Sequence, residues 1–305
     1  MAERFDYIII GSGSAGSALA YRLGESGKHR ILLLEYGGTD AGPLIQMPAA
    51  LSYPMNMKRY DWAYLAEAEA SLNGRRLVCP RGKVLGGSSS INGMIYVRGN
   101  AGDYDHWQEA GAQGWGYADV LPYFRRMEHA HGSAAGWRGT DGPLHVTRGP
   151  RDNPLHDAFV TAATEAGYTA VDDYNGFRQE GFGAADMTVW KGRRWSSANA
   201  YLRPALRRGN VKLITGALVE KILIDGKTAT GVAYWKAGKR YEVKARAETV
   251  LAAGAINSPQ IMQRSGVGPG AVLQNAGVDV VLERAGVGSN LQDHLEVYFQ
   301  IACLQ

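Results

Sequence analysis

The most constraining feature of the sequence is a glycine-rich turn between a short apolar run and a helical pattern. Residues 5–10 (FDYIII) predict a buried strand, and Ala15, Leu19 and Leu23 then recur at helical spacing up to about residue 26. Residues 30–34 (RILLL) predict the next buried strand, parallel to the first because a helix crosses between them. The pattern therefore predicts a βαβ unit.

The turn itself reads Gly11-Ser12-Gly13-Ser14-Ala15-Gly16. The first glycine permits a tight turn, the second lets a pyrophosphate approach the backbone, and the third lets the helix pack on the strand. The free N–H groups of the helix N-terminus attract phosphate. Glu35 ends the second strand, 19 residues after Gly16 (35 − 16). A carboxylate there accepts hydrogen bonds from ribose hydroxyls and disfavours a 2′-phosphate, so we expect an ADP-containing dinucleotide other than NADP.

Composition excludes several other classes of protein. Of 305 residues, 45% are hydrophobic and 20% charged, which suits a globular core. The net charge of +4 (33 basic minus 29 acidic) comes from scattered residues, so no nucleic-acid surface is predicted. Cys79 and Cys303 lack a CxxC partner, so no zinc-binding or redox motif of that kind is predicted. The histidines outside residues 290–296 have no ligand spacing, so we interpret each as an ordinary surface or paired histidine and predict no metal site: His29, His106, His129, His131, His145 and His156.

No apolar run approaches the ~18 residues of a membrane span, and the N-terminus lacks the pattern of a signal peptide. We therefore expect a cytoplasmic protein, either soluble or peripheral on the inner face of the cell membrane.

The remaining pattern predicts an α/β fold, a Rossmann-like parallel sheet with an added antiparallel meander. Residues 37–80 are expected to be irregular and residues 132–150 to form a loop or hairpin. Helices are expected over 103–131, in two pieces, over 155–166 and from about Ser258; meander strands over 211–224, 230–235 and 240–244; and further strands over 248–253 and 295–303.

Two longer segments resemble ligand-binding loops. Residues 81–105 contain Gly86-Gly87 followed by three serines, whose N–H and hydroxyl groups suit a pyrophosphate or the edge of a flavin ring. Residues 254–268 (GAINSPQIMQRSGVG) form a strand end that turns into a helix, with Pro259 near its first turn. Each segment alone fits an ordinary loop equally well.

Together these segments resemble the two signatures of the glucose–methanol–choline (GMC) family of FAD-dependent alcohol oxidoreductases. The resemblance extends over essentially the whole chain. It is strongest to the choline-oxidising members, through the stretches MPAALSYPMNMKRYDWAY, SSSINGMIYVRGN, DDYNGFRQEGFG and VGSNLQDHLEVYFQ.

The resemblance implies an FAD cofactor with Glu35 on the adenosine ribose. It places Val84 and the run Asn92, Gly93, Met94 and Ile95 against the pyrophosphate and isoalloxazine, with Gly87 and Ser88 as a second pyrophosphate contact. Val219 would meet the adenine through its backbone. We expect an FAD domain, made of residues 1–150 and 206–295, and part of a substrate domain, made of residues 151–205 and 296–305.

Some members of the family attach FAD through a histidine just before the asparagine of the first signature. Ile91 stands there and cannot form that bond, so a dissociable flavin is expected. In choline-oxidising relatives a histidine and a glutamate line the substrate pocket, and they match His294 and Glu296. If 294–298 is extended, both side chains share one face. A solvated Glu296 and a His294 paired with Asp293 remain the alternative.

The activity that the resemblance implies is oxidation of choline to betaine aldehyde, with hydride transfer to flavin N5. The family's catalytic histidine lies in a C-terminal segment that this sequence does not contain, so we expect a truncated chain that is inactive alone. A GMC enzyme for another alcohol and a non-catalytic FAD module of a split enzyme are the alternatives. The electron acceptor stays open, and exposed apolar surface is expected to favour a homo-oligomer.

Overall fold

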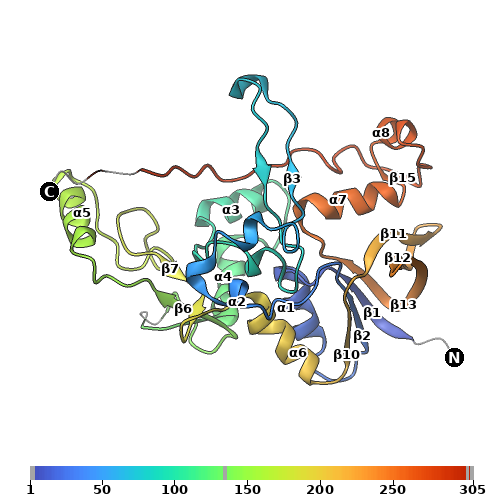
Figure 1. Cartoon of the computed structure of the whole chain (residues 1–305), viewed down its shortest axis with the longest axis horizontal. Coiled ribbons are helices and arrows are strands. Elements are labelled where there is room, and N and C mark those ends of the chain that lie inside the picture. The colour runs from blue at the N-terminus through green and yellow to red at the C-terminus, as the bar shows by residue number, and fades with distance from the viewer. Residues whose placement is uncertain (1–3, 133–135, 300–301, 303–305) are drawn as a thin grey trace.

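A mixed six-stranded sheet forms the centre of the computed structural model, which describes residues 4–132, 136–299 and 302 (Figure 1). Its order is β10-β2-β1-β13-β12-β11. The strands are β1 (Phe5–Ile10), β2 (Ile31–Leu34), β10 (Val211–Ile214), β11 (Leu218–Asp225), β12 (Thr228–Lys236) and β13 (Lys239–Leu251). The predicted βαβ unit is confirmed, since β1 and β2 pair in parallel and α1 (Ser14–Leu23) connects them.

One long strand, β13, joins the two parts of this sheet. Its first half pairs antiparallel with β12, up to the Gly231–Lys244 pair, and its second half pairs parallel with β1, from Phe5–Ala245 to Ile10–Leu251. The prediction of separate strands over 240–244 and 248–253 is therefore wrong. The strand stays continuous because its partner changes at residue 245.

The predicted meander strand over 211–224 divides in two. Its first part, β10, pairs in parallel with the outer edge of β2. Gly216 (φ +68°) then ends the extended conformation before β11 begins. Only β11 to β13 form the meander. Assigning 211–214 to the meander is wrong because the edge of β2 offers a parallel partner.

Alternate residues of the central strands pack into two cores on opposite faces of the sheet. Ile8 and Ile10 face one core with Ile261 of α7 (Gly254–Arg264). Ile9 faces the other, with residues of α1 and of the π-helical turn Ala198–Leu202 that leads into α6 (Arg203–Arg207). A parallel sheet buried on both faces explains why β1 and β2 are apolar at nearly every position.

A second region contains short helices and a three-stranded sheet; Figure 1 shows α5, β6 and β7 on the left and α3 and α4 nearer the centre. The two predicted helical pieces are α3 and α4, but residues 128–130 form a strand rather than helix. Residues 155–166 form a helix as predicted. The elements are α3 (Ala101–Glu109), α4 (Tyr117–Met127), β5 (Glu128–Ala130), β6 (Leu144–Arg148), α5 (Pro154–Glu165), β7 (Asp186–Met187), β8 (Val189–Trp190) and β9 (Arg193–Arg194).

A buried ion cluster holds this second region together. The Glu128 carboxylate accepts from Arg98 Nη2 at 2.7 Å and from Arg138 Nε at 2.8 Å. Arg138 Nη1 also donates to Asp173 at 2.7 Å and to Asp186 at 2.8 Å. Glu128 is fully buried, so its strand is tied to residues far along the chain by charge-assisted bonds.

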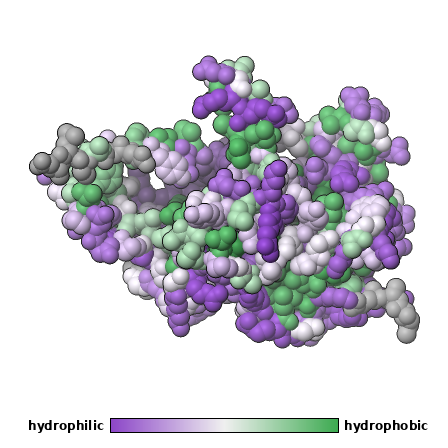
Figure 2. All heavy atoms as spheres, viewed as in Figure 1, coloured by the Kyte–Doolittle hydropathy of each residue, from purple (hydrophilic) through white to green (hydrophobic). Residues whose placement is uncertain are grey.

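Residues 37–80 contain only short elements, as expected: α2 (Pro43–Gln46), β3 (Tyr64–Leu65), β4 (Val78–Cys79) and 3₁₀ turns. The β3–β4 pair forms an arm that projects from the sheet (Figure 1). Figure 2 shows a hydrophilic tip and a hydrophobic base, where Leu65, Leu77 and Val78 are exposed.

After α7 the chain forms β14 (Val267–Gly268), α8 (Gly270–Asn275) and β15 (Leu282–Glu283). The strand predicted over 295–303 is absent from residues 295–299, where Leu295 is 93% and Phe299 87% exposed and no strand pairs with them; the rest of that segment, apart from residue 302, lies outside the described residues. Among the described residues, no helix is both long and apolar enough to cross a membrane.

Candidate functional site

A cavity of about 550 Å³ lies at the carboxyl ends of the central parallel strands. The last residues of three strands line it, namely Ile10 of β1, Leu34 of β2 and Leu251 of β13. Ligands of open α/β sheets bind at such a crevice, where the chain connections diverge to opposite sides of the sheet. The volume is in the usual range of ligand pockets, roughly 300–1,000 Å³.

Two helices begin at this cavity. α1 follows β1 and α7 follows β13, and the first residues of both helices line the cavity. Neither N-cap residue makes a side-chain cap bond, so N–H groups of both first turns are free for a ligand. Their aligned peptide dipoles favour an anionic group between them. The helix predicted from Ser258 begins four residues earlier, which places Pro259 inside α7.

The glycines of the first turn have different steric roles. A Cβ on Gly16 would lie 1.9 Å from the Gly11 carbonyl oxygen, so α1 can approach β1 only with glycine there. A Cβ on Gly13 would meet only the Gly87 Cα, at 3.9 Å. Gly13 therefore lines the cavity without a packing need of its own, as expected where a ligand must approach the backbone.

The Glu35 carboxylate lies at the end of β2 and is tied to the same turn. Its Oε2 accepts from the Ser12 backbone N–H and hydroxyl, each at 2.9 Å, and its Oε1 accepts from Gly37 N–H at 2.7 Å. Burial raises its pKa, and these hydrogen bonds oppose the rise. The carboxylate belongs to a residue that lines the cavity.

The first signature packs directly onto the glycine turn. Gly86 N–H donates to the Ser12 carbonyl at 3.0 Å, and a Cβ on Gly87 (φ +54°) would lie 2.7 Å from Gly13 Cα. Gly87 and Ser88 line the cavity beside Gly13. The two glycine-rich segments, which are about 70 residues apart in the sequence, thus form one continuous cradle.

Arg194 anchors the other side of this signature, a role that sequence reasoning did not assign. Its guanidinium is fully buried and donates to Ile45 O at 2.9 Å, Asn92 O at 2.7 Å and Asn92 Oδ1 at 2.9 Å. Burial lowers its pKa to about 10, so it stays charged at neutral pH. Ser197 N–H donates to Ser89 Oγ at 2.9 Å and strengthens the same anchor.

Three aromatic rings at the cavity were also missed. Trp62 stacks between Tyr36, at 5.1 Å, and Tyr64, at 6.0 Å, and the Tyr64 hydroxyl donates to Asn257 of α7. All four side chains belong to residues that line the cavity. The sequence signal was the spacing of Trp62 and Tyr64, two residues apart, in a segment interpreted only as irregular.

The remaining predicted residues lie at different distances from the cavity. Val219 lines it, whereas Val84 is buried in an adjacent apolar cluster with Ile91. The run 92–95 continues from the cradle with Met94 buried and Ile95 exposed. His294 and Glu296 lie on the exposed coil after β15 and are not among the residues that line the cavity. The backbone N–H of His294 donates to Asp293 Oδ1 at 2.9 Å.

Strand pairing brings together three histidines, His129, His131 and His145, for which the sequence showed no ligand spacing. Among the described residues, their nitrogens form the one group of three or more histidine, cysteine or acidic side chains close enough together to hold a metal ion. Cys79 is a free thiol, and Cys303 lies outside the described residues.

Comparison with known proteins assigns the chain to a family. The family profile for GMC oxidoreductase matches residues 5–296. The chain belongs to the GMC oxidoreductase family. Curated GMC relatives include the oxygen-dependent choline dehydrogenases of Brucella anthropi, 60% identical over 98% of this chain, and of Rhizobium meliloti, 59% identical over 97%. Both alignments span 54% of the relative, so the chain corresponds to about half the length of these GMC proteins.

Solved structures of GMC-like proteins have the same fold. Pyridoxine 4-oxidase from Mesorbium loti matches with a TM-score of 0.88 and 34% identity over 92% of this chain and 55% of its own. An FAD-dependent oxidoreductase from Chaetomium thermophilum matches with a TM-score of 0.88 and 31% identity over 95% and 52%. The predicted α/β fold with a parallel sheet is confirmed.

Proposed function

We propose that this chain is the FAD-binding portion of a GMC enzyme that oxidises choline to betaine aldehyde. The observation that carries the proposal is the cavity at the ends of β1, β2 and β13, toward which two uncapped helix N-termini and the Glu35 carboxylate point. Anion-binding helix ends beside a buried carboxylate suit a nucleotide with a pyrophosphate and a ribose.

The residues fit FAD in detail. Gly11, Gly13, Ser14 and Ala15 offer backbone to the pyrophosphate on one side, and Gly87 and Ser88 do so on the other. Ser12 and Gly16 hold the turn in shape behind them, and Glu35 accepts from the adenosine ribose.

The isoalloxazine side is assigned to the run 92–95, with Val84 behind it and Val219 toward the adenine. Arg194 supports this assignment, because it fixes the backbone of Asn92 from within the protein. When bound, the flavin supplies the acceptor of the substrate hydride. The chain's own residues bind and orient it and exclude water from the cradle.

We propose that the flavin is held without a covalent bond. Ile91 occupies the position from which a histidine would attach it, and its side chain is buried with Ile45, Tyr60 and Val84. An aliphatic side chain has no nucleophile.

Choline is the proposed substrate because curated relatives at about 60% identity are choline dehydrogenases. A fixed trimethylammonium group needs a carboxylate or aromatic faces. We assign Glu296 to the ammonium and His294 to the polar side of the substrate pocket, and no catalytic base to this chain. Residues 1–150 and 206–295 are proposed as the cofactor domain, with 151–205 and 296–305 in the substrate domain.

A chimera tests the substrate assignment. This chain would be joined to the C-terminal part of the Brucella anthropi relative, and alcohol oxidation would be followed with a dye acceptor. The proposal predicts choline as the alcohol with the highest kcat/KM. Glu296→Gln should raise KM for choline while kcat for an uncharged alcohol stays the same, and Glu283→Gln serves as the control. Equal KM values for choline in wild type and Glu296→Gln would refute the anchor.

A further inference from the structure

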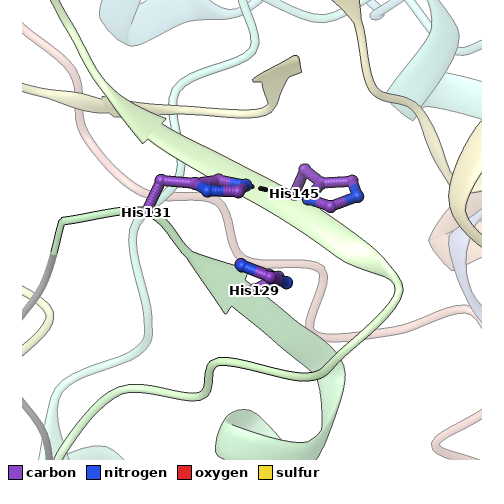
Figure 3. Close-up of side chains that lie close together, drawn as sticks. All are labelled: His129, His131 and His145. Atoms are coloured by element: carbon purple, nitrogen blue, oxygen red, sulfur yellow. Dashed lines mark hydrogen bonds between the residues drawn. The ribbon is translucent and has the colours of Figure 1, made fainter.

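Strand geometry brings three histidines onto one face of the small sheet. His129 lies on β5, and His131 follows two residues later, so their side chains share a face. The ladder continues past the strand end, because His131 N–H donates to Val146 O at 2.9 Å. On β6, His145 is the direct partner of His129. Figure 3 shows the three imidazoles gathered between these strands.

The rings are held in one compact group. His131 Nε2 and His145 Nδ1 share a hydrogen bond of 2.9 Å (Figure 3). His129 stacks on His131 at 4.2 Å between centroids. The indole of Trp190, on β8, stacks against His131 at 3.9 Å and His145 at 4.6 Å. Each histidine offers one nitrogen, and these nitrogens lie within 4.8 Å of one another.

The surroundings favour neutral rings. Among the described residues, no carboxylate is hydrogen-bonded or ion-paired to the three imidazoles. Burial lowers the pKa of His131, and His129 lowers it further. Burial likewise lowers the pKa of His145, with added repulsion from the other two histidines and Lys191. The case for a metal site rests on the placement of the three ligand nitrogens.

We propose that His129, His131 and His145 form a binding site for one divalent transition metal ion of the zinc, nickel or copper class. Imidazole nitrogens suit these ions, and three histidines with an open position for water form a known zinc set. Ligand nitrogens about 2.0–2.1 Å from a tetrahedral ion lie about 3.3 Å apart, so the His131 and His145 nitrogens, now 2.9 Å apart, need to separate only slightly to bind one. On binding, the shared proton moves to the far nitrogen of its ring.

The ion would tie β5 to β6 under the Trp190 indole. None of the three histidines lines the cavity at the parallel strands, so this site does not depend on the proposed flavin. The alternative is that the three histidines and Trp190 form only a structural aromatic stack. A metal site would bind an added ion through the histidines, whereas a structural stack would not.

Calorimetric titration of the purified, tag-free chain with Zn²⁺ tests the site. One ion per chain is expected. Because changing even an outer-shell partner typically costs about 10–100-fold in affinity, His131→Gln and His145→Gln should each weaken binding by at least ~100-fold. His106→Gln, on the exposed surface of α3, is the matched control and should bind as wild type does. Urea unfolding without metal checks that each variant is folded.

Copper provides a second readout. Cu²⁺ bound to the site should quench the fluorescence of Trp190, so the quenching amplitude should fall in Trp190→Phe while Zn²⁺ affinity is kept within about tenfold. The nitrogen hyperfine structure in the electron paramagnetic resonance spectrum of bound Cu²⁺ should be weaker in His129→Gln than in wild type. The proposal is overturned if wild type binds Zn²⁺ no more tightly than folded His131→Gln, or if His106→Gln loses binding equally.

Discussion

The backbone N–H and the hydroxyl of Ser12 both donate to the same carboxylate oxygen of Glu35, each at 2.9 Å. This pair links the turn after β1 to the end of β2, two segments 23 residues apart. The link orients the carboxylate at the cavity and shapes the first glycine turn at the same time. Cofactor binding and the local fold are therefore coupled through one side chain.

That coupling predicts a pH effect on stability in the absence of flavin. Burial raises the pKa of Glu35 above its usual value of 4.5, so the folded state holds this proton more tightly than the unfolded state. Protonated Glu35 therefore contributes fully to the free energy of unfolding below pH 4.5, and this contribution is lost as pH rises through the pKa of Glu35 in the folded state. Above that pKa, the cost of ionising a buried group is constant.

Glu35→Gln lacks the titration and provides the comparison. Urea unfolding of wild type and Glu35→Gln from acid to neutral pH should show the difference in unfolding free energy moving against wild type as pH rises. The other carboxylates cancel in this difference. A difference that does not change with pH would contradict the buried ionisation.

Substitutions at Gly16 and Gly13 should have different effects, one on stability and the other on FAD affinity. Gly16→Ala places a methyl group 1.9 Å from a carbonyl oxygen, so it should destabilise the chain by roughly 3 kcal/mol or more. Gly13→Ala meets nothing closer than 3.9 Å and should leave unfolding nearly unchanged. Its methyl group would occupy space at the cavity where we propose that the pyrophosphate binds, so FAD affinity should fall by roughly tenfold or more, about 1.4 kcal/mol. Thermal unfolding and flavin fluorescence measure the two effects separately; equal stability losses would contradict the assignment.

Arg194 should be needed for both stability and flavin binding. Arg194→Met removes four hydrogen bonds from a buried charge to carbonyl oxygens and should lower the free energy of unfolding by roughly 3 kcal/mol. FAD affinity should fall as well, since Asn92 loses its support. The exposed neighbour provides a control, because Arg193→Met should change stability by less than about 0.5 kcal/mol. Equal effects of both substitutions would show that the buried position has no special role.

The flavin should dissociate when the protein unfolds. Protein reconstituted with FAD would be precipitated with acid, and the proposal predicts that all flavin stays in the supernatant, because Ile91 offers no attachment atom. Ile91→His tests whether position 91 lies near the ring, since covalent flavin should then remain in the pellet. Flavin bound to precipitated wild type would contradict the proposal.

Local sequence was sufficient for β1, α1 and β2, since their hydrophobic periods and glycine spacing lie within one short segment. The pairing of β10 and β13 could not be predicted in this way. Arg246 and Glu248 interrupt the apolar pattern of β13, yet the strand continues because β1 replaces β12 as its partner. Which strand pairs with β13 depends on how the whole sheet assembles, so it cannot be read from the local sequence.

The site shows the same limit. The glycines and Glu35 were found because one motif contains them, whereas Arg194 and Trp62 reach the site through contacts between distant segments. The i, i+2 spacing of His129 and His131 was visible, but the third histidine depends on the β5–β6 register.

Titration of the purified chain with FAD, followed by quenching of flavin fluorescence, tests the central claim most directly. The account predicts one FAD per chain, with weaker binding in folded Gly13→Ala and Glu35→Ala and unchanged binding in Glu25→Ala on the surface. It also predicts that NADP⁺ does not displace the flavin. Absence of FAD binding by the folded chain, or equal affinity in wild type and Gly13→Ala, would contradict it.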